Sequence, residues 1–157
     1  HIFDHHNPPP VSLEGMPCIH TAPSLRKVGD KWEKICVGTT TSTRMDRFTP
    51  GLIGQYGVRA IIGKGGLYQG SLDAMQKYGA VYLAIVGGAA ALETEQIEKV
   101  EAVYFEELHP EALYRFRVKN FGPLTVAMDS HGVHLYDQVT ENVKKKLPEI
   151  YAKLGVL

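Results

Sequence analysis

Cysteine, net charge and long apolar runs are all scarce in this sequence, and each absence excludes a class of protein. The chain has only two cysteines, Cys18 and Cys36, which are too few and too far apart for a disulfide scaffold or a CxxC metal site. Two thiols also cannot ligate an iron–sulfur cluster, which takes three or four. We therefore expect a reduced chain in the cytoplasm.

The charges balance, since 17 Lys and Arg residues face 17 Asp and Glu residues and the formal net charge is zero. Nonspecific binding to nucleic acid and attachment to a membrane surface both need an excess of positive charge. The longest apolar candidate, residues 80–92, is shorter than the roughly 18 residues that a membrane span needs. We expect neither nucleic acid nor membrane as a partner.

Residues 1–12 are expected to form an arm or linker, and residues 13–157 a single domain. Three consecutive prolines at positions 8–10 favour extended backbone, and a chain of 157 residues suits one domain. The sequence opens on His1 rather than Met, so we expect it to be part of a longer product.

Apolar runs separated by glycine-rich turns predict an α/β protein with a mixed β core and a few packed helices. The expected strands are residues 17–20, 34–38, 58–63, 81–87, 103–106, 113–118 and 124–128, the last forming a hairpin with residues 133–136. Helices are predicted over residues 71–78, with Ser71 as N-cap and Gly79 after its end, and over 94–102, with Thr94 as N-cap. A third helix is predicted over 137–154, kinked or split by Pro148.

The first candidate site is the run Gly-Thr-Thr-Thr-Ser-Thr-Arg-Met-Asp at residues 38–46, directly after an apolar strand. Hydroxyl and backbone N–H groups in such a loop can cradle an oxyanion, and the planar fork of Arg44 matches a carboxylate. We therefore take Thr40, Thr41 and Arg44 as candidate site residues. An alternative interpretation of the same residues is a threonine-rich edge strand in which Arg44 pairs with Asp46 or Asp30.

Two further glycine turns follow predicted strands. Lys64 lies between Gly63 and Gly65, where a ligand meets little steric obstruction, although the spacing fits neither a Walker loop nor GxGxxG. The third turn, Val-Gly-Gly-Ala-Ala-Ala at residues 86–91, favours close packing. The histidines do not match a zinc site, so no metal ligand is predicted. Seven glutamates and one lysine between Glu93 and Glu111 predict an exposed acidic face.

Taken in order, the three turns resemble the beta subunit, or C-terminal domain, of class I iron–sulfur fumarate hydratases and the related L-tartrate dehydratases. The family's first motif reads Gly-Pro-Thr-Thr-Ser/Ala-Gly-Arg-Met-Asp, and this chain has Thr39 and Thr43 at its proline and glycine. Residues 111–114 (Glu-Ala-Leu-Tyr) and 129–132 (Asp-Ser-His-Gly) resemble the downstream pattern. The family's Arg-Asp-x-x-His segment would lie upstream of His1.

The resemblance implies a swivelling β/β/α domain that docks onto a larger alpha subunit as a hetero-oligomer. In the family that partner holds a [4Fe–4S] cluster whose open iron acts as a Lewis acid. The reaction is reversible hydration of a dicarboxylate double bond, and fumarate to L-malate is the expected case, with L-tartrate dehydration or a non-catalytic dicarboxylate-binding domain as alternatives. By position, Thr40 and Arg44 are expected to be catalytic, and Thr41, Arg44 and Lys64 to bind substrate.

Overall fold

The computed structural model describes residues 2–156 and has a mixed four-stranded sheet at its centre. The strand order is β1 (Pro17–Ile19), β4 (Ala60–Gly63), β5 (Val81–Ala84) and β8 (Thr125–Met128). The first three are parallel and β8 is antiparallel to β5, which confirms the predicted α/β class with a mixed β core. Because β1, β4 and β5 are parallel, their carboxyl ends lie at one edge of the sheet.

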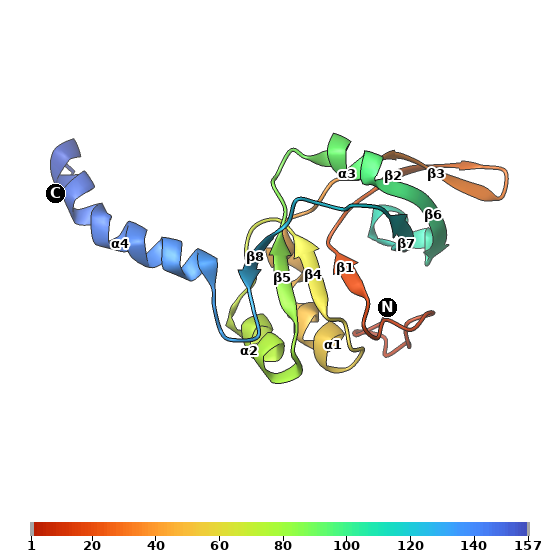
Figure 1. Cartoon of the computed structure of the whole chain (residues 1–157), viewed down its shortest axis with the longest axis horizontal. Helices are drawn as coiled ribbons and strands as arrows, with labels where there is room; N and C mark the ends of the chain where they lie inside the picture. The colour runs from red at the N-terminus through yellow and green to blue at the C-terminus, as the bar shows by residue number, and fades with distance from the viewer. Residues whose placement is uncertain (1, 157) are drawn as a thin grey trace.

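Two antiparallel hairpins lie beside this sheet (Figure 1). One joins β2 (Ser24–Val28) to β3 (Lys31–Cys36), and the other joins β6 (Ile97–Tyr104) to β7 (Leu113–Val118) through the short helix η2 (Glu106–Glu111). Strand β3 contacts β6, so the hairpins form a second lobe with α3 (Ala90–Gln96) against it.

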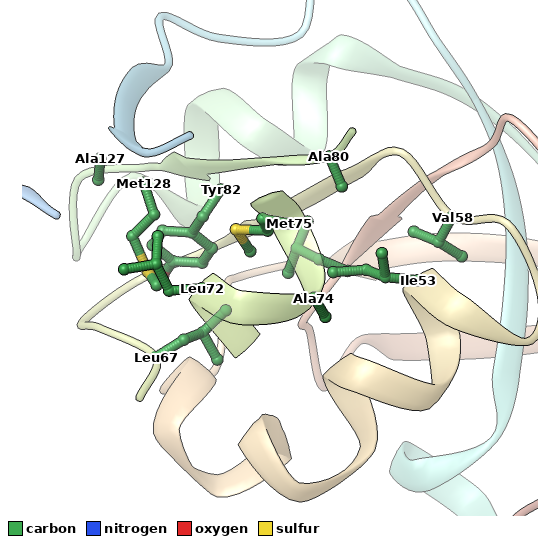
Figure 2. Close-up of a cluster of buried hydrophobic side chains, with 11 residues drawn as sticks. Ile53, Val58, Leu67, Leu72, Ala74, Met75, Ala80, Tyr82, Ala127 and Met128 are labelled. Atoms are coloured by element: carbon green, nitrogen blue, oxygen red, sulfur yellow. The ribbon is translucent and has the colours of Figure 1, made fainter. Parts of the chain in front are cut away.

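The main core lies between the sheet and the helices α1 (Thr49–Gly54) and α2 (Gln69–Tyr78). Tyr82 and Met128 from the sheet meet Leu72 and Met75 from α2 in this core, and all four are buried (Figure 2). Each large apolar side chain removed from water contributes about 1.5–3 kcal/mol, so this cluster holds α2 against the sheet.

Some predicted elements are wrong. Residues 97–102 form the first part of β6 rather than a helix, and the helix before them, α3, begins at Ala90 instead of Thr94. The second hairpin strand at residues 133–136 is reduced to one bridge between Met128 and His134. Helix α2 begins at Gln69, so Ser71 is not its N-cap, whereas Gly79 does end it in a left-handed conformation.

The last helix, α4 (Leu135–Leu154), continues through Pro148 as one element, so the predicted split is wrong. Figure 1 shows α4 projecting away from the rest of the protein. None of its residues is buried within the described chain, and apolar side chains such as Val139, Val143 and Ile150 face solvent. Across residues 2–156, no helix combines the length and apolarity required to cross a membrane.

Candidate active site at the carboxyl edge of the sheet

Residues 39–46, here called the hydroxyl loop, are held between the ends of two parallel strands. The backbone N–H of Thr40 donates to the carbonyl of His20, just after β1, over 2.9 Å. The N–H of Ser42 donates to the carbonyl of Lys64, just after β4, also over 2.9 Å. Because both strands belong to the central sheet, the loop is fixed at its carboxyl edge, where open α/β sheets bind ligands.

The hydroxyl loop turns into a helix and does not continue as an edge strand. Residues Ser42–Phe48 form the 3₁₀ helix η1, which brings the Arg44 side chain back over Thr40. The Arg44 Nη2 atom donates a hydrogen bond to the Thr40 hydroxyl oxygen. Within residues 2–156 no ion pair joins Arg44 to Asp46 or Asp30, so the alternative interpretation of this arginine is wrong.

A buried polar contact supports the loop from beneath. The Tyr82 hydroxyl lies 3.0 Å from the Ser42 Oγ and 2.9 Å from the carbonyl oxygen of Gly65. Burial raises the pKa of Tyr82 to about 12, so its phenol stays protonated and able to donate. Gly63 leaves the space for this contact, because a Cβ at that position would lie 1.9 Å from the Ser42 Oγ.

Asp46 ties the end of the loop to α2. Its Oδ1 accepts from the backbone N–H of Tyr68 over 2.8 Å and from the Ser71 hydroxyl over 2.7 Å. A carboxylate at this place also interacts favourably with the positive end of the helix dipole. Asp46 therefore has two structural partners in α2 and its N-terminal turn, and no ion pair joins it to Arg44 within residues 2–156.

Lys64 and Thr41 lie next to each other at the end of β4. Their backbones form a parallel bridge, and both side chains are half-buried. The Lys64 side chain runs toward the third glycine turn, since a Cβ at Gly87 would lie 3.8 Å from its Cδ. Ala90 of the same turn packs against Gly38, the residue before the hydroxyl loop, because a Cβ at Gly38 would be 3.0 Å from the Ala90 Cβ. All three predicted turns therefore lie together, but the predicted close packing of the third is found only at Ala90: a Cβ at Gly88 would meet nothing within 4 Å, and residues 86–88 are exposed.

A cavity of about 820 Å³ opens on one side of the hydroxyl loop. Thr40 and Arg44 line it together with His20, whereas Lys64 and Thr41 are absent from the lining within the described chain. Aromatic side chains from both lobes, including Phe48 and Tyr104, form much of the remaining wall. The structure thus brings Thr40 and Arg44 to the cavity wall and leaves Lys64 outside it.

Two buried titratable groups border the hydroxyl loop, and sequence reasoning missed both. His20 is 3% exposed and Glu93 is 1% exposed, and neither side chain has a hydrogen-bond partner within residues 2–156. Burial lowers the pKa of His20 to about 4, although Asp46 opposes this, so the imidazole is neutral. Glu93 corrects the prediction of a uniformly exposed acidic face. His20 follows β1 as Lys64 follows β4, and that shared position was the signal available for it.

The thiols of this chain do not form a cluster site. Cys18 is in β1 and Cys36 is in β3, and burial raises the pKa of Cys18 to about 11, which keeps that thiol protonated. Residues 2–156 hold no group of three or more His, Cys, Asp or Glu side chains placed to bind a metal ion. A [4Fe–4S] cluster therefore does not fit the residues of this chain.

Comparison with known proteins identifies the family. Residues 1–139 match the family model described as Fumarase C-terminus. The chain is 43% identical over 138 residues to the L(+)-tartrate dehydratase subunit beta of Escherichia coli K12, covering 67% of that protein. It is 43% identical to a candidate L(+)-tartrate dehydratase subunit beta of Methanocaldococcus jannaschii, covering 73% of it. It is 37% identical to a candidate class I fumarate hydratase of Geobacillus stearothermophilus, matching 95% of this chain and 29% of that protein. The chain therefore belongs to the fumarase C-terminal family.

Proposed function

We propose that this chain is the beta subunit of a hydro-lyase that adds water to, or removes it from, a four-carbon dicarboxylate. The hydrogen bond from Arg44 to Thr40 at the cavity carries the proposal. A guanidinium binds a carboxylate through two parallel N–H donors, so Arg44 can hold one end of the substrate. An N–H donated to the Thr40 oxygen stabilises its alkoxide, the form able to accept a proton from a substrate carbon.

Lys64 is proposed to bind the second carboxylate. Lys64 lies at the end of β4, where its backbone carbonyl accepts a hydrogen bond from the Ser42 N–H of the hydroxyl loop. Its ammonium group ends a flexible four-carbon stem, so it can reach past the loop toward a ligand held by Arg44. Thr41 precedes Arg44 by three residues, forms a backbone bridge with Lys64, and offers a further hydroxyl donor.

A cluster-bearing alpha subunit is proposed to complete the site. Three observations support this arrangement: the chain's own thiols cannot hold a cluster, Arg44 is exposed, and two of the relatives are named as beta subunits. Within this assembly we assign binding, orientation and proton transfer to Arg44, Lys64 and Thr40. The [4Fe–4S] cluster itself belongs to the partner in this proposal.

L-Tartrate and fumarate both present two carboxylates on a four-carbon frame, so Arg44 and Lys64 suit either. We place L-tartrate first, because relatives with that name are 43% identical and are covered over 67% and 73% of their lengths. Fumarate, the substrate expected from sequence alone, is the second candidate, because the fumarate hydratase relative matches 95% of this chain.

The test is an anaerobic assay of water addition and removal with L-tartrate, fumarate and L-malate in parallel. This chain alone, the iron-reconstituted alpha subunit alone, and the two mixed should be compared. Activity only in the mixture, lost with Arg44→Ala or Lys64→Ala, is the expected result. Arg26→Ala serves as a matched control, because Arg26 is exposed on β2 and pairs with Glu33 away from the site.

Silence of the mixture on every substrate would overturn the enzyme proposal, provided that a mixture of the two subunits elutes as one complex. Saturable binding of a dicarboxylate by this chain in that case would favour a non-catalytic binding domain. Activity of this chain without the cluster-bearing partner would contradict the shared site.

A further inference from the structure

The N-terminal segment of the chain packs on the helix that carries Arg44. The Phe3 ring stacks on the ring of Phe48, the last residue of η1, with centroids 5.6 Å apart and planes inclined by 23°. It also meets the Tyr56 ring edge-on, at a centroid distance of 5.8 Å. Phe3 therefore joins the end of η1 to the residues that follow α1.

Gly51, in α1, leaves the space that the Phe3 ring occupies. A Cβ at Gly51 would lie 2.3 Å from one ring atom of Phe3 and 2.9 Å from another, well inside the separation at which carbon atoms attract. No larger residue fits at position 51 while the ring is in place. Phe48, Gly51 and Tyr56 thus form a slot for this ring, here called the Phe3 slot.

A polar contact fixes the next residue of the segment against the same helix. The Asp4 carboxylate accepts from the Arg47 Nη2 over 2.7 Å, and the Arg47 guanidinium lies 4.3 Å from the centre of the Phe48 ring. Because both partners of the ion pair are exposed, it adds little to the stability of the fold. It does place Asp4 beside the last turn of η1, so residues 3 and 4 hold that turn together.

The helix η1 depends on support from outside. It is a 3₁₀ helix of seven residues, and 3₁₀ geometry seldom continues beyond about four residues because its hydrogen bonds are poorly aligned. Ser42 anchors its first residue to the end of β4, and Asp46 ties it to α2. Phe3 and the slot hold its last turn. The position of Arg44, between these ends, therefore depends on contacts at both.

The same N-terminal segment borders the candidate site. Ile2, Phe3 and Asp4 line the cavity that Thr40 and Arg44 also line. A ring that is fixed in the cavity wall and against η1 can set the position of Arg44 without contacting the substrate.

We propose that Phe3 is a positioning residue for Arg44: seated in its slot, it holds the last turn of η1 and so keeps the Arg44 guanidinium beside Thr40 at the cavity. The inference rests on the proposed role of Arg44 in binding a substrate carboxylate. A shift of about 1 Å caused by a change far from the reacting atoms can lower a rate about 100-fold. Since Phe3 acts through the helix, we expect Phe3→Ala to lower kcat/KM of the reconstituted complex less, by about tenfold.

The first experiment compares Phe3→Ala with Gly51→Ala in the reconstituted complex. Gly51→Ala fills the slot and displaces the ring without removing it, so it should lower kcat/KM by a similar factor. The kcat/KM of the double variant should be only slightly lower than that of either single variant, because the ring can be lost from its slot only once.

Two controls match these changes. Gly70→Ala adds a methyl group to another helix, where its Cβ meets nothing within 4 Å. Tyr151→Ala removes a ring from an exposed position of α4. Both control complexes should keep the kcat/KM of the unaltered complex. Phe3→Leu, which fills part of the slot, should recover part of the activity lost in Phe3→Ala.

A second cycle separates positioning from a general effect on stability. If Phe3 acts through Arg44, Phe3→Ala should lower kcat/KM little further in a complex that already carries Arg44→Lys. If Phe3 only stabilises the fold, the fold-losses of the two variants should multiply. That result, or an unchanged kcat/KM in Phe3→Ala alone, would overturn the proposal.

A third readout needs no turnover. Amide hydrogen exchange of the full chain, followed by mass spectrometry of its peptides, measures how readily each helix opens. Phe3→Ala should speed exchange severalfold over residues 42–54, which form η1 and α1, and change residues 69–78 in α2 much less. Equal exchange over residues 42–54 in Phe3→Ala and the unaltered chain would overturn the inference. If the complex turns over no dicarboxylate, the proposed function fails and the exchange experiment alone decides whether Phe3 holds η1.

Discussion

The guanidinium group of Arg44 donates a hydrogen bond to the hydroxyl oxygen of Thr40, four residues earlier in the chain. This contact exists because η1 begins at Ser42 and folds Arg44 back over the start of the loop. A cation and a hydroxyl are thereby presented together to the cavity, and neither is committed to a carboxylate of the described chain. The pair is the central element of the candidate site.

Arg44 and Thr40 should behave as a unit in a double-mutant cycle. A hydrogen bond to a charged group contributes about 1.5–3 kcal/mol, so Arg44→Lys should lower kcat/KM of the complex about 10- to 150-fold. Thr40→Val should lower kcat/KM by a similar factor, and the kcat/KM of the double variant should be only slightly lower than that of either single variant. If the fold-losses of the two single variants multiply in the double variant, the two residues act independently. Arg26→Lys should leave kcat/KM unchanged.

Gly63 should resist even one methyl group. A Cβ there would lie 1.9 Å from the Ser42 Oγ and 3.3 Å from the Tyr82 hydroxyl, and both groups are buried. We expect Gly63→Ala to lower the free energy of unfolding by about 1–3 kcal/mol in urea titrations, because the buried contact must shift. Gly70→Ala is the control: its Cβ meets nothing within 4 Å, and in α2 it should be neutral or stabilising. Equal stability of the two variants would contradict this account.

The stability of the chain should fall in mild acid because of His20. Its folded pKa of about 4 lies below the ordinary value of 6.5, so the unfolded chain binds a proton at higher pH than the folded chain. The neutral His20 therefore contributes fully to the free energy of unfolding above pH 6.5. This contribution, at most about 3 kcal/mol, is lost as the pH falls toward 4. His20→Leu should flatten the pH dependence of the unfolding free energy over this range, whereas His131→Asn, at an exposed position, should retain it.

Asp46 should stabilise the protein through α2. Removing its carboxylate leaves the Tyr68 N–H and the Ser71 hydroxyl without their shared acceptor. Asp46→Ala should therefore lower the unfolding free energy by about 1–2 kcal/mol, the usual effect of losing a helix cap. Asp73→Ala, which removes an exposed side chain bonded to Gln69 on the same helix, should change stability much less. A larger loss in Asp73→Ala would contradict the capping role.

The sequence predicted the strands of the central sheet better than it predicted the helices. The strands that end in glycine-flanked polar residues could be predicted from the sequence. A buried apolar run followed by Lys64 or by the hydroxyl loop is compatible with few structures other than a strand that ends in a turn. Residues 97–102 were predicted as helix because Ile97 and Val100 are three apart. In the structure, β6 has register shifts between Ile97 and Lys99 and between Val100 and Ala102. A bulge adds one residue to a strand, so two side chains three apart can share a face.

Contacts between residues far apart in the sequence explain the elements that the local sequence pattern did not predict. Helix α1 reads Thr-Pro-Gly-Leu-Ile-Gly, a composition typical of a loop. Its glycines are required by tertiary packing, because a Cβ at Gly51 would lie 2.3 Å from a ring atom of Phe3 and one at Gly54 2.9 Å from a ring atom of Tyr78. Glu93 was missed for a similar reason: what buries it comes from distant parts of the chain, while its neighbours in sequence suggested a solvated acidic face.

Helix α4 has a consequence for how this protein can vary. The family match ends at residue 139, a few residues into the helix, and none of the residues of α4 within the described chain is buried. Substitutions along most of its length therefore remove no packing contact of the hydrophobic core. Removal of the helix beyond residue 139 should accordingly leave the core of the domain folded, whereas a single methyl group at Gly63 disturbs it.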